Sequence, residues 1–507
     1  GVVFATIDVD GHRETHPIKA AGFRNWLKRL FYQESEKPPS NQPLQDALGI
    51  LEAKGMFEGP ELPVFTRVGG RGNAIYIDTG NKQWEALEIT PAGWRVIQNP
   101  PVKFRRPRGM MPLPCPVSGQ TLEALRPYLN LSNDDDFKLI VAWVIAAIRQ
   151  VGPYPVLVLN GEQGTAKSTL TKILKALIDP SSSPLRSIPK EARDLAVFAN
   201  NNWVLALDNL SKLPDWLSDA ICRLATGGGF AARELYTDDL EVIFTATRSV
   251  VLNGISEFVT RHDLADRCIV INLSPISEKK RLSEKKLWAD FEHDAPGILG
   301  ALCDAVSCGL RNIDSVKLDR LPRMADFALW ITAAEEALPW SAGGFMKAYT
   351  RNLKEVVEQT LDADLVASAV RSYIQDNLAG FEGSPGDFLN LLCDREGEKI
   401  TRSKSWPKSP SHLTQRLKRA ATSLRAFGIE VVTGLRLANK KRGVTVKSIG
   451  DDKSPAVTTD DKIQKLSSQN KDESFSDVAG PSDDRDDRDD KISRYSQDAK
   501  SFMRVEL

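Results

Sequence analysis

Pro155-Val-Leu-Val-Leu-Asn160-Gly161-Glu162-Gln163-Gly164-Thr165-Ala166-Lys167-Ser168-Thr169 is the stretch that decides the fold of this chain. An apolar run leads into a glycine loop that ends in Lys-Ser-Thr, and apolar residues then recur at helical spacing at Leu170, Ile173, Leu174 and Leu177. The order strand, phosphate loop, helix is typical of proteins that bind nucleoside triphosphates.

The loop predicts ATP and Mg²⁺ as cofactors. Its backbone N–H groups and the helix N-terminus can cradle phosphate oxygens, with Lys167 at the β/γ-phosphates and Ser168 on Mg²⁺. Ala166 stands where the last glycine of G-x-x-x-x-G-K-[ST] is usual, and because alanine is the smallest replacement, the cradle should survive. The alternative is a strand-to-helix turn that merely needed glycine.

Length and composition indicate a cytoplasmic protein with no membrane partner. The 507 residues suffice for about three domains. The six cysteines include no C-x-x-C pair, which argues against a zinc site or a disulfide framework. The longest apolar run, 139–148, is too short to span a bilayer, and no secretory signal opens the chain. Because the first residue is Gly1, we expect the natural chain to begin earlier.

The net charge of zero conceals a strong asymmetry. Residues 401–447 hold twelve Lys/Arg against one acid, a net charge of +11, whereas residues 451–507 hold fifteen Asp/Glu and ten Lys/Arg, a net charge of −5. A basic module therefore precedes an acidic tail with few large apolar residues, which we expect to be disordered.

Composition and periodicity divide the chain into six segments. Apolar strands at 203–209 and 250–253 alternate with helices, one of them capped by Asn133, which predicts an α/β fold built on a parallel sheet. The expected segments are a mixed α+β domain at 1–98, a proline-rich basic linker at 99–116, a nucleotide domain with its lid at 117–350, a helical connector at 351–400, a basic helix-plus-wing module at 401–450 and the tail at 451–507. The basic residues of the linker either keep it solvated or contact nucleic acid.

Two polar residues end the buried strands that follow the loop. Asp208 could take Mg²⁺ through water, and Asn253 could hold the γ-phosphate or the attacking water. The alternative for each is a turn residue after a strand.

At these residues the chain resembles AAA+ ATPases, and within them the superfamily 3 and minichromosome-maintenance helicases. Gly-Glu-Gln-Gly-Thr-Ala-Lys-Ser is similar to the Walker A motif of the latter. Asp208-Asn-Leu-Ser, Thr226-Gly-Gly-Gly-Phe and a Trp-Pro-Lys-rich C-terminal module resemble ATP-binding proteins of phages and integrative elements. The resemblance covers about residues 100 to 447.

The resemblance implies a ring whose subunits share their ATP sites. Arg267 matches the position of the arginine finger, which reaches ATP bound by a neighbour, so a homo-oligomer is expected, most naturally a hexamer. The alternatives are a surface pair of Arg267 with Asp263 or Asp266, and Arg261 as the finger. Arg323 could be the lid's sensor 2 or could pair with Asp326.

Asn209 departs from the AAA+ pattern, which has a glutamate after the Walker B aspartate. An amide can orient water but cannot accept its proton, so hydrolysis would be slow or would use another carboxylate, with Asp215 and Asp219 nearest in sequence.

Nucleic-acid contacts are expected at two places. A hairpin of 230–236 and 240–245 would approach DNA through Arg233 or Arg248, unless it is only a solvated edge. In the basic module, whose charge could otherwise be a solvated face, a helix stripe and a wing tip would meet phosphates. Their residues are His412, Arg416, Arg419, Lys440, Lys441 and Arg442.

These observations together predict an ATP-dependent DNA helicase or translocase of a phage or mobile element. The resemblance also implies a possible primase domain upstream or as a partner. The alternative is an ATP-gated DNA-binding switch or loader without helicase activity, which Asn209 favours. A small-molecule kinase is disfavoured by the basic module.

Overall fold

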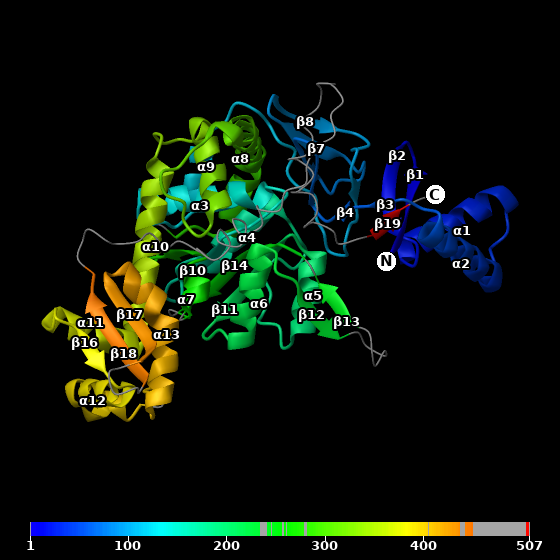
Figure 1. The fold of residues 1–507 in the computed structure, drawn as a ribbon. Helices are drawn as coiled ribbons and strands as arrows, with labels where there is room; N and C mark the ends of the chain where they lie inside the picture. The colour runs from blue at the N-terminus through cyan, green and yellow to red at the C-terminus, as the bar shows by residue number, and fades with distance from the viewer. Residues whose placement is uncertain are drawn as a thin grey trace, which may run out of the picture.

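The computed structural model describes residues 2–233, 241–244, 246–255, 258–259, 261–277, 281–403, 405–436, 442–449 and 503–505 (Figure 1). Residues 230–233, 241–244 and 503–505 are described as backbone only. Among these residues, no helix combines the length and the apolar character that a membrane crossing requires.

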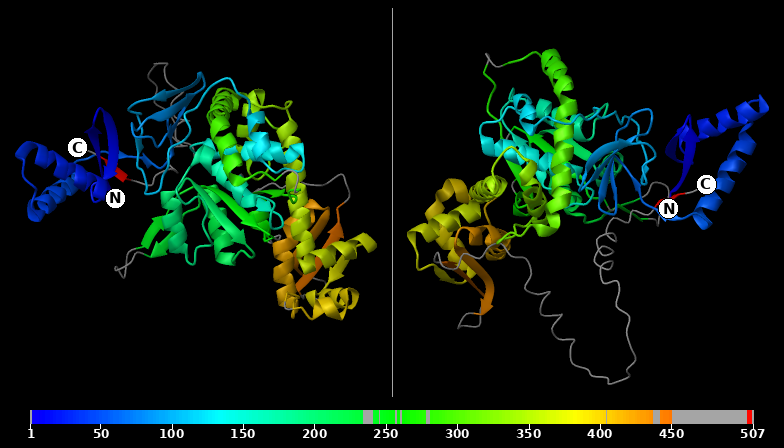
Figure 2. Two further views of the ribbon diagram at one scale, coloured as in Figure 1. Left: turned by 180° about the vertical axis from the view of Figure 1, so that it is seen from behind. Right: turned by 90° about the horizontal axis from the view of Figure 1, so that it is seen from above.

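A small unit opens the chain. Strands β1 (Val3–Val9) and β2 (His12–Pro17) pair in antiparallel fashion, and helices α1 (Ala21–Ser35) and α2 (Asn41–Phe57) pack on them. Strand β19 (Met503–Val505) lies between β1 and β3 (Glu61–Leu62). This unit has a separate core and lies at one end of the molecule (Figure 2).

A second, antiparallel sheet follows and belongs to the main body. It consists of β5 (Val68–Arg71), β6 (Ala74–Asp78), β7 (Ala86–Thr90) and β8 (Gly93–Ile97), beside the pair β4 (Val64–Phe65) and β9 (Lys103–Phe104). Its Val68, Ile75 and Leu87 share one hydrophobic core with the helices of the nucleotide domain. The core therefore crosses residue 98, where the sequence suggested a domain boundary, because alternation alone does not show which partner covers a sheet face.

A buried ion network locks this sheet to the nucleotide domain. The fully buried guanidinium of Arg67 donates to Asp179 (3.3 Å) and to the carbonyls of Asp78, Met111 and Pro180. Segment 99–116, expected to be an extended connector, thus forms part of the packed body.

The central sheet is parallel, as the sequence predicts. Its order is β11 (Val204–Leu210), β14 (Ser249–Gly254), β10 (Val156–Asn160) and β15 (Cys268–Asn272). One face packs against α3 (Asp134–Ile148) and α4 (Lys167–Ile178), and the other against α5 (Ala192–Asn201), α6 (Asp215–Thr226) and α7 (His262–Ala265). The cap expected at Asn133 is present, since its side-chain oxygen accepts a hydrogen bond from the backbone N–H of Asp136 at 2.8 Å.

Further helices cover the α3 side. They are the 3₁₀ segment η1 (Leu122–Tyr128), α8 (Glu284–Asn312), η3 (Ile313–Ser315), α9 (Ala325–Ala334), η4 (Glu335–Ala337) and α10 (Gly344–Ala363). A hairpin of β12 (Phe230–Arg233) and β13 (Glu241–Phe244) projects beside α5, within the ranges expected for its strands (Figure 1).

The C-terminal unit consists of three helices and a three-stranded sheet. They are α11 (Leu365–Asp376), β16 (Phe381–Gly383), α12 (Pro385–Thr401), α13 (Pro410–Ala426), β17 (Ile429–Arg436) and β18 (Arg442–Ser448), with strand order β16-β18-β17. A single core extends from Leu361 to Val446, so the segments expected as connector and basic module are parts of one unit.

Candidate nucleotide-binding site

The phosphate loop joins β10 to α4 at the carboxyl edge of the parallel sheet. Gly164 has φ +84° and Ala166 has φ +62°, so both occupy the left-handed region that turns the chain into the helix. The Lys167 ammonium donates to the carbonyls of Gly161 and Glu162 at 2.7 Å each. The Asn130 side chain donates to the carbonyls of Thr165 (3.1 Å) and Ser274 (2.7 Å), which links the loop to the segment that follows β15.

Four side chains from β11, β14 and α4 converge at the carboxyl edge of the sheet. The Ser168 hydroxyl lies 3.1 and 3.0 Å from the two carboxylate oxygens of Asp208. The Asn253 amide donates to Asp208 Oδ1 at 2.9 Å, and Thr171 Oγ1 donates to Asn253 Oδ1 at 2.9 Å. The structure therefore brings Ser168 and Thr171 of α4 together with Asp208 and Asn253, which are distant from them in sequence. Lys167 lies close enough to interact electrostatically with Asp208.

The donor set fits a magnesium–nucleotide complex. Hydroxyl and carboxylate oxygens are ligands that Mg²⁺ prefers, and the positive end of α4 faces the same point. Partial burial lowers the pKa of Lys167, against the opposing effect of Asp208. The loop residues Glu162, Gln163 and Gly164 are exposed, so their backbone is accessible to a ligand.

Asn209 adopts a conformation that its residue type explains. It has φ +60°, lies in a bulge between Leu207 and Leu210, and is exposed. Asparagine tolerates this left-handed backbone better than glutamate does. Of the two substitute carboxylates considered, Asp219 forms an ion pair with Arg261 at 2.7 Å, and Asp215 offers its backbone carbonyl to the same arginine.

Arg267 and Arg323 meet in one cluster around Asp263, in α7. Arg267 pairs with Asp263, as the alternative from the sequence held, and Arg323 pairs with Asp263 (3.0 Å) and Asp266 (3.2 Å). The partner of Arg323 is thus not Asp326. Only 14% of the Arg267 side chain is exposed, compared with 38% for Arg261.

Three residues near the site were not predicted from the sequence to have a role there. Arg281 Nη2 lies 4.0 Å from the point where a Cβ on Gly164 would stand, which brings a second cation to the loop. The buried Asn160 Oδ1 has no hydrogen-bond partner among the described residues. Thr171 orients Asn253. Because Thr171 lies one helical turn after Ser168, its position could have suggested that it faces the site. Arg281 belongs to no recognisable motif.

The residues expected to contact DNA differ in their surroundings. Arg248 donates to the carbonyls of Ala199 (2.8 Å), Asn202 (3.0 Å) and Thr247 (2.9 Å), and burial lowers its pKa to about 10. Arg416 pairs with Asp364 at 2.9 Å. His412, Arg419 and Arg442 are exposed. Lys440, Lys441 and the side chain of Arg233 lie outside the described residues.

One hydrogen bond joins the C-terminal unit to the arginine cluster. His262 Nδ1 in α7 lies 2.6 Å from Ser423 Oγ in α13. Burial lowers the pKa of His262, so a neutral imidazole is favoured at this contact.

Comparison with known proteins places the chain among replication proteins of mobile elements. The family model for the actinomycete integrative conjugative element replication protein matches residues 122–358, and the model for the C-terminal domain of these RepA proteins matches residues 366–460. Together they cover well over half of the chain. No curated protein has a significantly matching sequence.

Solved structures of the NrS-1 C-terminal region resemble the chain only weakly. The apo structure of region 305–718 has 13% identity and a TM-score of 0.40, and the alignment covers 89% of this chain and 96% of that one. The A form has 13% identity, the same coverage and a TM-score of 0.38.

Proposed function

We propose that this chain, a replication protein of the actinomycete integrative conjugative element family, binds ATP with Mg²⁺ and uses ATP hydrolysis to move along or unwind DNA. The observation that carries the proposal is the convergence of Ser168, Asp208, Asn253 and Thr171 beside the β10–α4 loop. A turn that merely needed glycine would not require this network.

Each residue then has a chemical role. Lys167 exchanges its two loop carbonyls for phosphate oxygens, and the N–H groups of residues 161–169 donate to the same phosphates. Ser168 and Asp208 hold the Mg²⁺, which would neutralise charge on the phosphates. Asn253, fixed by Thr171, orients water or the γ-phosphate. Arg281 supplies a cation from the same subunit.

We further propose that the chain assembles as an AAA+-like ring, most naturally a hexamer. The support is the matching position of Arg267, which shares Asp263 with Arg323 in one charged cluster. Arg261 pairs separately with Asp219. The greater exposure of Arg261 makes it the rival finger. The C-terminal unit would act as a winged helix, with His412 and Arg419 on α13 and the β17–β18 hairpin as the wing.

Asn209 supports a second candidate, an ATP-gated DNA-binding switch or loader. Its exposed, left-handed position offers no group that could accept a proton from water, because the side chain is an amide. Such a protein would bind ATP tightly but turn it over slowly.

The test is ATP hydrolysis with and without single-stranded DNA, for the wild type, Lys167→Ala, Arg267→Ala and Arg261→Ala. A ring motor requires DNA-stimulated turnover that falls at least about a hundredfold in Lys167→Ala and in the true finger variant. Mixing those two variants should restore part of the activity, since mixed interfaces regain complete sites. ATP binding without turnover in the wild type would reject the motor and favour the switch.

A further inference from the structure

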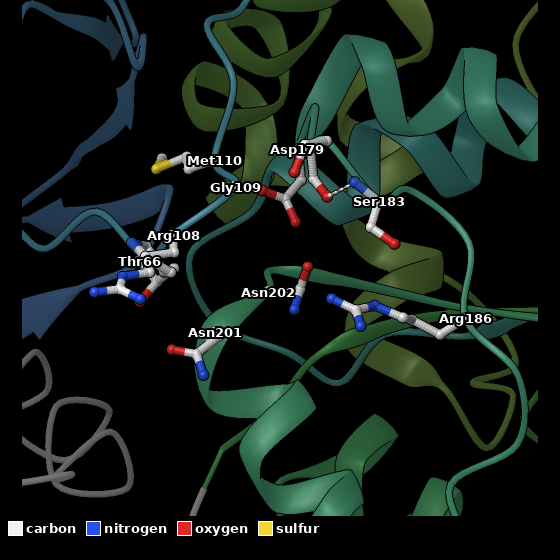
Figure 3. A pocket seen from close by; sticks show the side chains of 12 residues that line it. Thr66, Arg108, Gly109, Met110, Asp179, Ser183, Arg186, Asn201 and Asn202 are labelled. Carbon is white, nitrogen blue, oxygen red and sulfur yellow. Dashed lines mark hydrogen bonds between the residues drawn. The ribbon is translucent and has the colours of Figure 1, made fainter.

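A polar cavity of about 340 Å³ opens between the N-terminal sheets and the β11 edge of the central sheet (Figure 3). No residue of the phosphate loop lines it. In Figure 3 Arg108 and Arg186 approach it from opposite sides, with Asn202 between them and Asn201 below. Hydroxyls come from the serines of the turn after α4 and from Thr66, between β4 and β5. The polar residues used below are Arg108, Ser182, Ser183, Arg186, Asn201 and Asn202.

The two arginines of the cavity are exposed and have no ion-pair or side-chain hydrogen-bond partner among the described residues. Other arginines of the basic segment 99–116 are occupied: Arg105 donates to Asn200, and Arg106 pairs with Asp78 at 2.6 Å. Arg108 alone of these three is available to a ligand. The Arg186 guanidinium lies 5.7 Å from the Phe198 ring, a contact that leaves its N–H groups free.

The single acid in the cavity wall is neutralised from within the protein. The Asp179 carboxylate forms ion pairs with Arg67 (3.3 Å) and Lys175 (3.3 Å). It also accepts hydrogen bonds from the backbone N–H groups of Trp203 (2.9 Å) and Val204 (3.1 Å). Its pKa is lowered by Lys175 and Arg67 against the effect of burial. The cavity therefore presents a net positive charge from the two arginines.

We infer that this cavity is a second phosphate site, which takes a phosphodiester group of single-stranded DNA. Guanidinium, hydroxyl and side-chain amide groups are the donors that bind phosphate oxygens. The lining includes no aromatic ring on which the base of a free nucleotide could stack. Helix α5, which ends at Asn201, packs against β12, so the cavity lies beside the projecting hairpin.

One residue of the cavity wall, Arg186, is also hydrogen-bonded to β11, the strand that carries Asp208. The backbone carbonyl of Arg186 accepts the amide of Asp208 at 2.8 Å, and its N–H donates to Ala206 at 3.0 Å. A phosphate held by Arg186 would steady the segment that orients Asp208, which offers a direct route from DNA to the ATP site. This inference rests on the proposed DNA-dependent ATPase function.

The test compares full-length Arg108→Ser/Arg186→Ser with Arg193→Ser/Lys347→Ser, which removes two exposed charges outside the cavity. Anisotropy with labelled oligothymidylate would be measured from 50 to 300 mM NaCl, and ATP binding with a fluorescent analogue. We expect the cavity variant to bind DNA about tenfold more weakly than the control, with a salt slope smaller by about 1.4, because each lost contact to a single strand removes about 0.7.

The outcomes separate the possible failures. If the wild type binds DNA but the cavity variant behaves like the control, the second phosphate site is rejected while the proposed function stands. If the cavity variant loses ATP affinity as strongly as DNA affinity, the cavity holds free nucleotide and the inference is overturned. If the wild type does not bind DNA at all, both proposals fail.

Discussion

At the scale of single residues, two positions with left-handed backbone and one partly buried carboxylate are locally unfavourable, and substitution can measure their effect on the free energy of unfolding. Ala166 and Asn209 both have positive φ, and Asp136 is a partly buried acid in the first turn of α3. The left-handed backbone is unfavourable for Ala166, whereas burial opposes the ionisation of Asp136.

Ala166→Gly should stabilise the protein. A Cβ in the left-handed region costs roughly 1–2 kcal/mol, part of which the greater freedom of glycine in the unfolded chain offsets, so a gain of about 1 kcal/mol is expected. Urea unfolding measures it. Gly164→Ala is the matched control and should lose stability, because φ there is +84°. Loss of stability in Ala166→Gly would contradict the prediction.

Asp136→Asn should stabilise the protein at pH 7.5 but not near pH 4. Burial first, then Glu355 and Asp135, raises the pKa of Asp136 to about 6. The stability that protonation of Asp136 contributes is therefore fully present below its ordinary pKa and is lost as pH rises through 6. Allowing for partial exposure and the helix dipole, removal of the charge should gain about 1 kcal/mol at pH 7.5.

Asp134→Asn is the control for this prediction. Asp134 is in the same turn, but Lys138 and then Arg126 lower its pKa, so its neutralisation should destabilise at neutral pH. A gain in Asp136→Asn that is as large at pH 4 as at pH 7.5 would exclude the pH mechanism.

At the scale of elements, the contact between α7 and α13 joins the arginine cluster to the C-terminal unit. His262 has its Nε2 buried without a partner among the described residues, so Ser423 provides the sole hydrogen bond of the ring there. Loss of that bond leaves a buried polar ring unpaired, which is costlier than loss of both partners.

Ser423→Ala should lower the free energy of unfolding by about 1–2 kcal/mol. The same change in a His262→Leu background should lower it by less than half as much. A double-mutant cycle on the unfolding transition of the C-terminal unit measures the coupling. Thr422→Ala, at an exposed position on the same helix, is the control. Strictly additive effects would show that the two side chains do not depend on each other.

The central sheet and its nearest helices could be predicted from the sequence. Continuous apolar strands, the Asn133 cap and the glycine after α13 are local signals, and the elements they predict are present. The meeting of Lys167, Ser168, Asp208 and Asn253 followed from the rule that parallel strands end at one edge. The approach of Arg281 to Gly164 and the partners of Arg323 could not be predicted, because tertiary packing places them.

At the scale of the whole molecule, the body begins near residue 64. A fragment of residues 117–449 would lack Arg67 and leave Asp179 and Lys175 as a buried pair without its third member, besides exposing the apolar face that the β5–β8 sheet covers. Breaking a buried ionic group in this way costs about 3–5 kcal/mol.

A fragment of residues 64–449 should therefore melt cooperatively and stay monodisperse, whereas residues 117–449 should aggregate. Circular dichroism melting and size-exclusion chromatography would show the difference. Two fragments with equal melting temperatures would mean that the Arg67 network adds nothing to the body.

The Arg67–Asp179 bond also limits how such a gene can recombine. A crossover near residue 117, just before the family match begins at residue 122, would join the arginine of one parent to the aspartate of another. The two halves of one core would then have to be compatible. A crossover between β3 and β4 exchanges only a unit with a separate core. Mobile elements that trade segments of their replication genes should therefore retain junctions near residue 63 and lose those near residue 117.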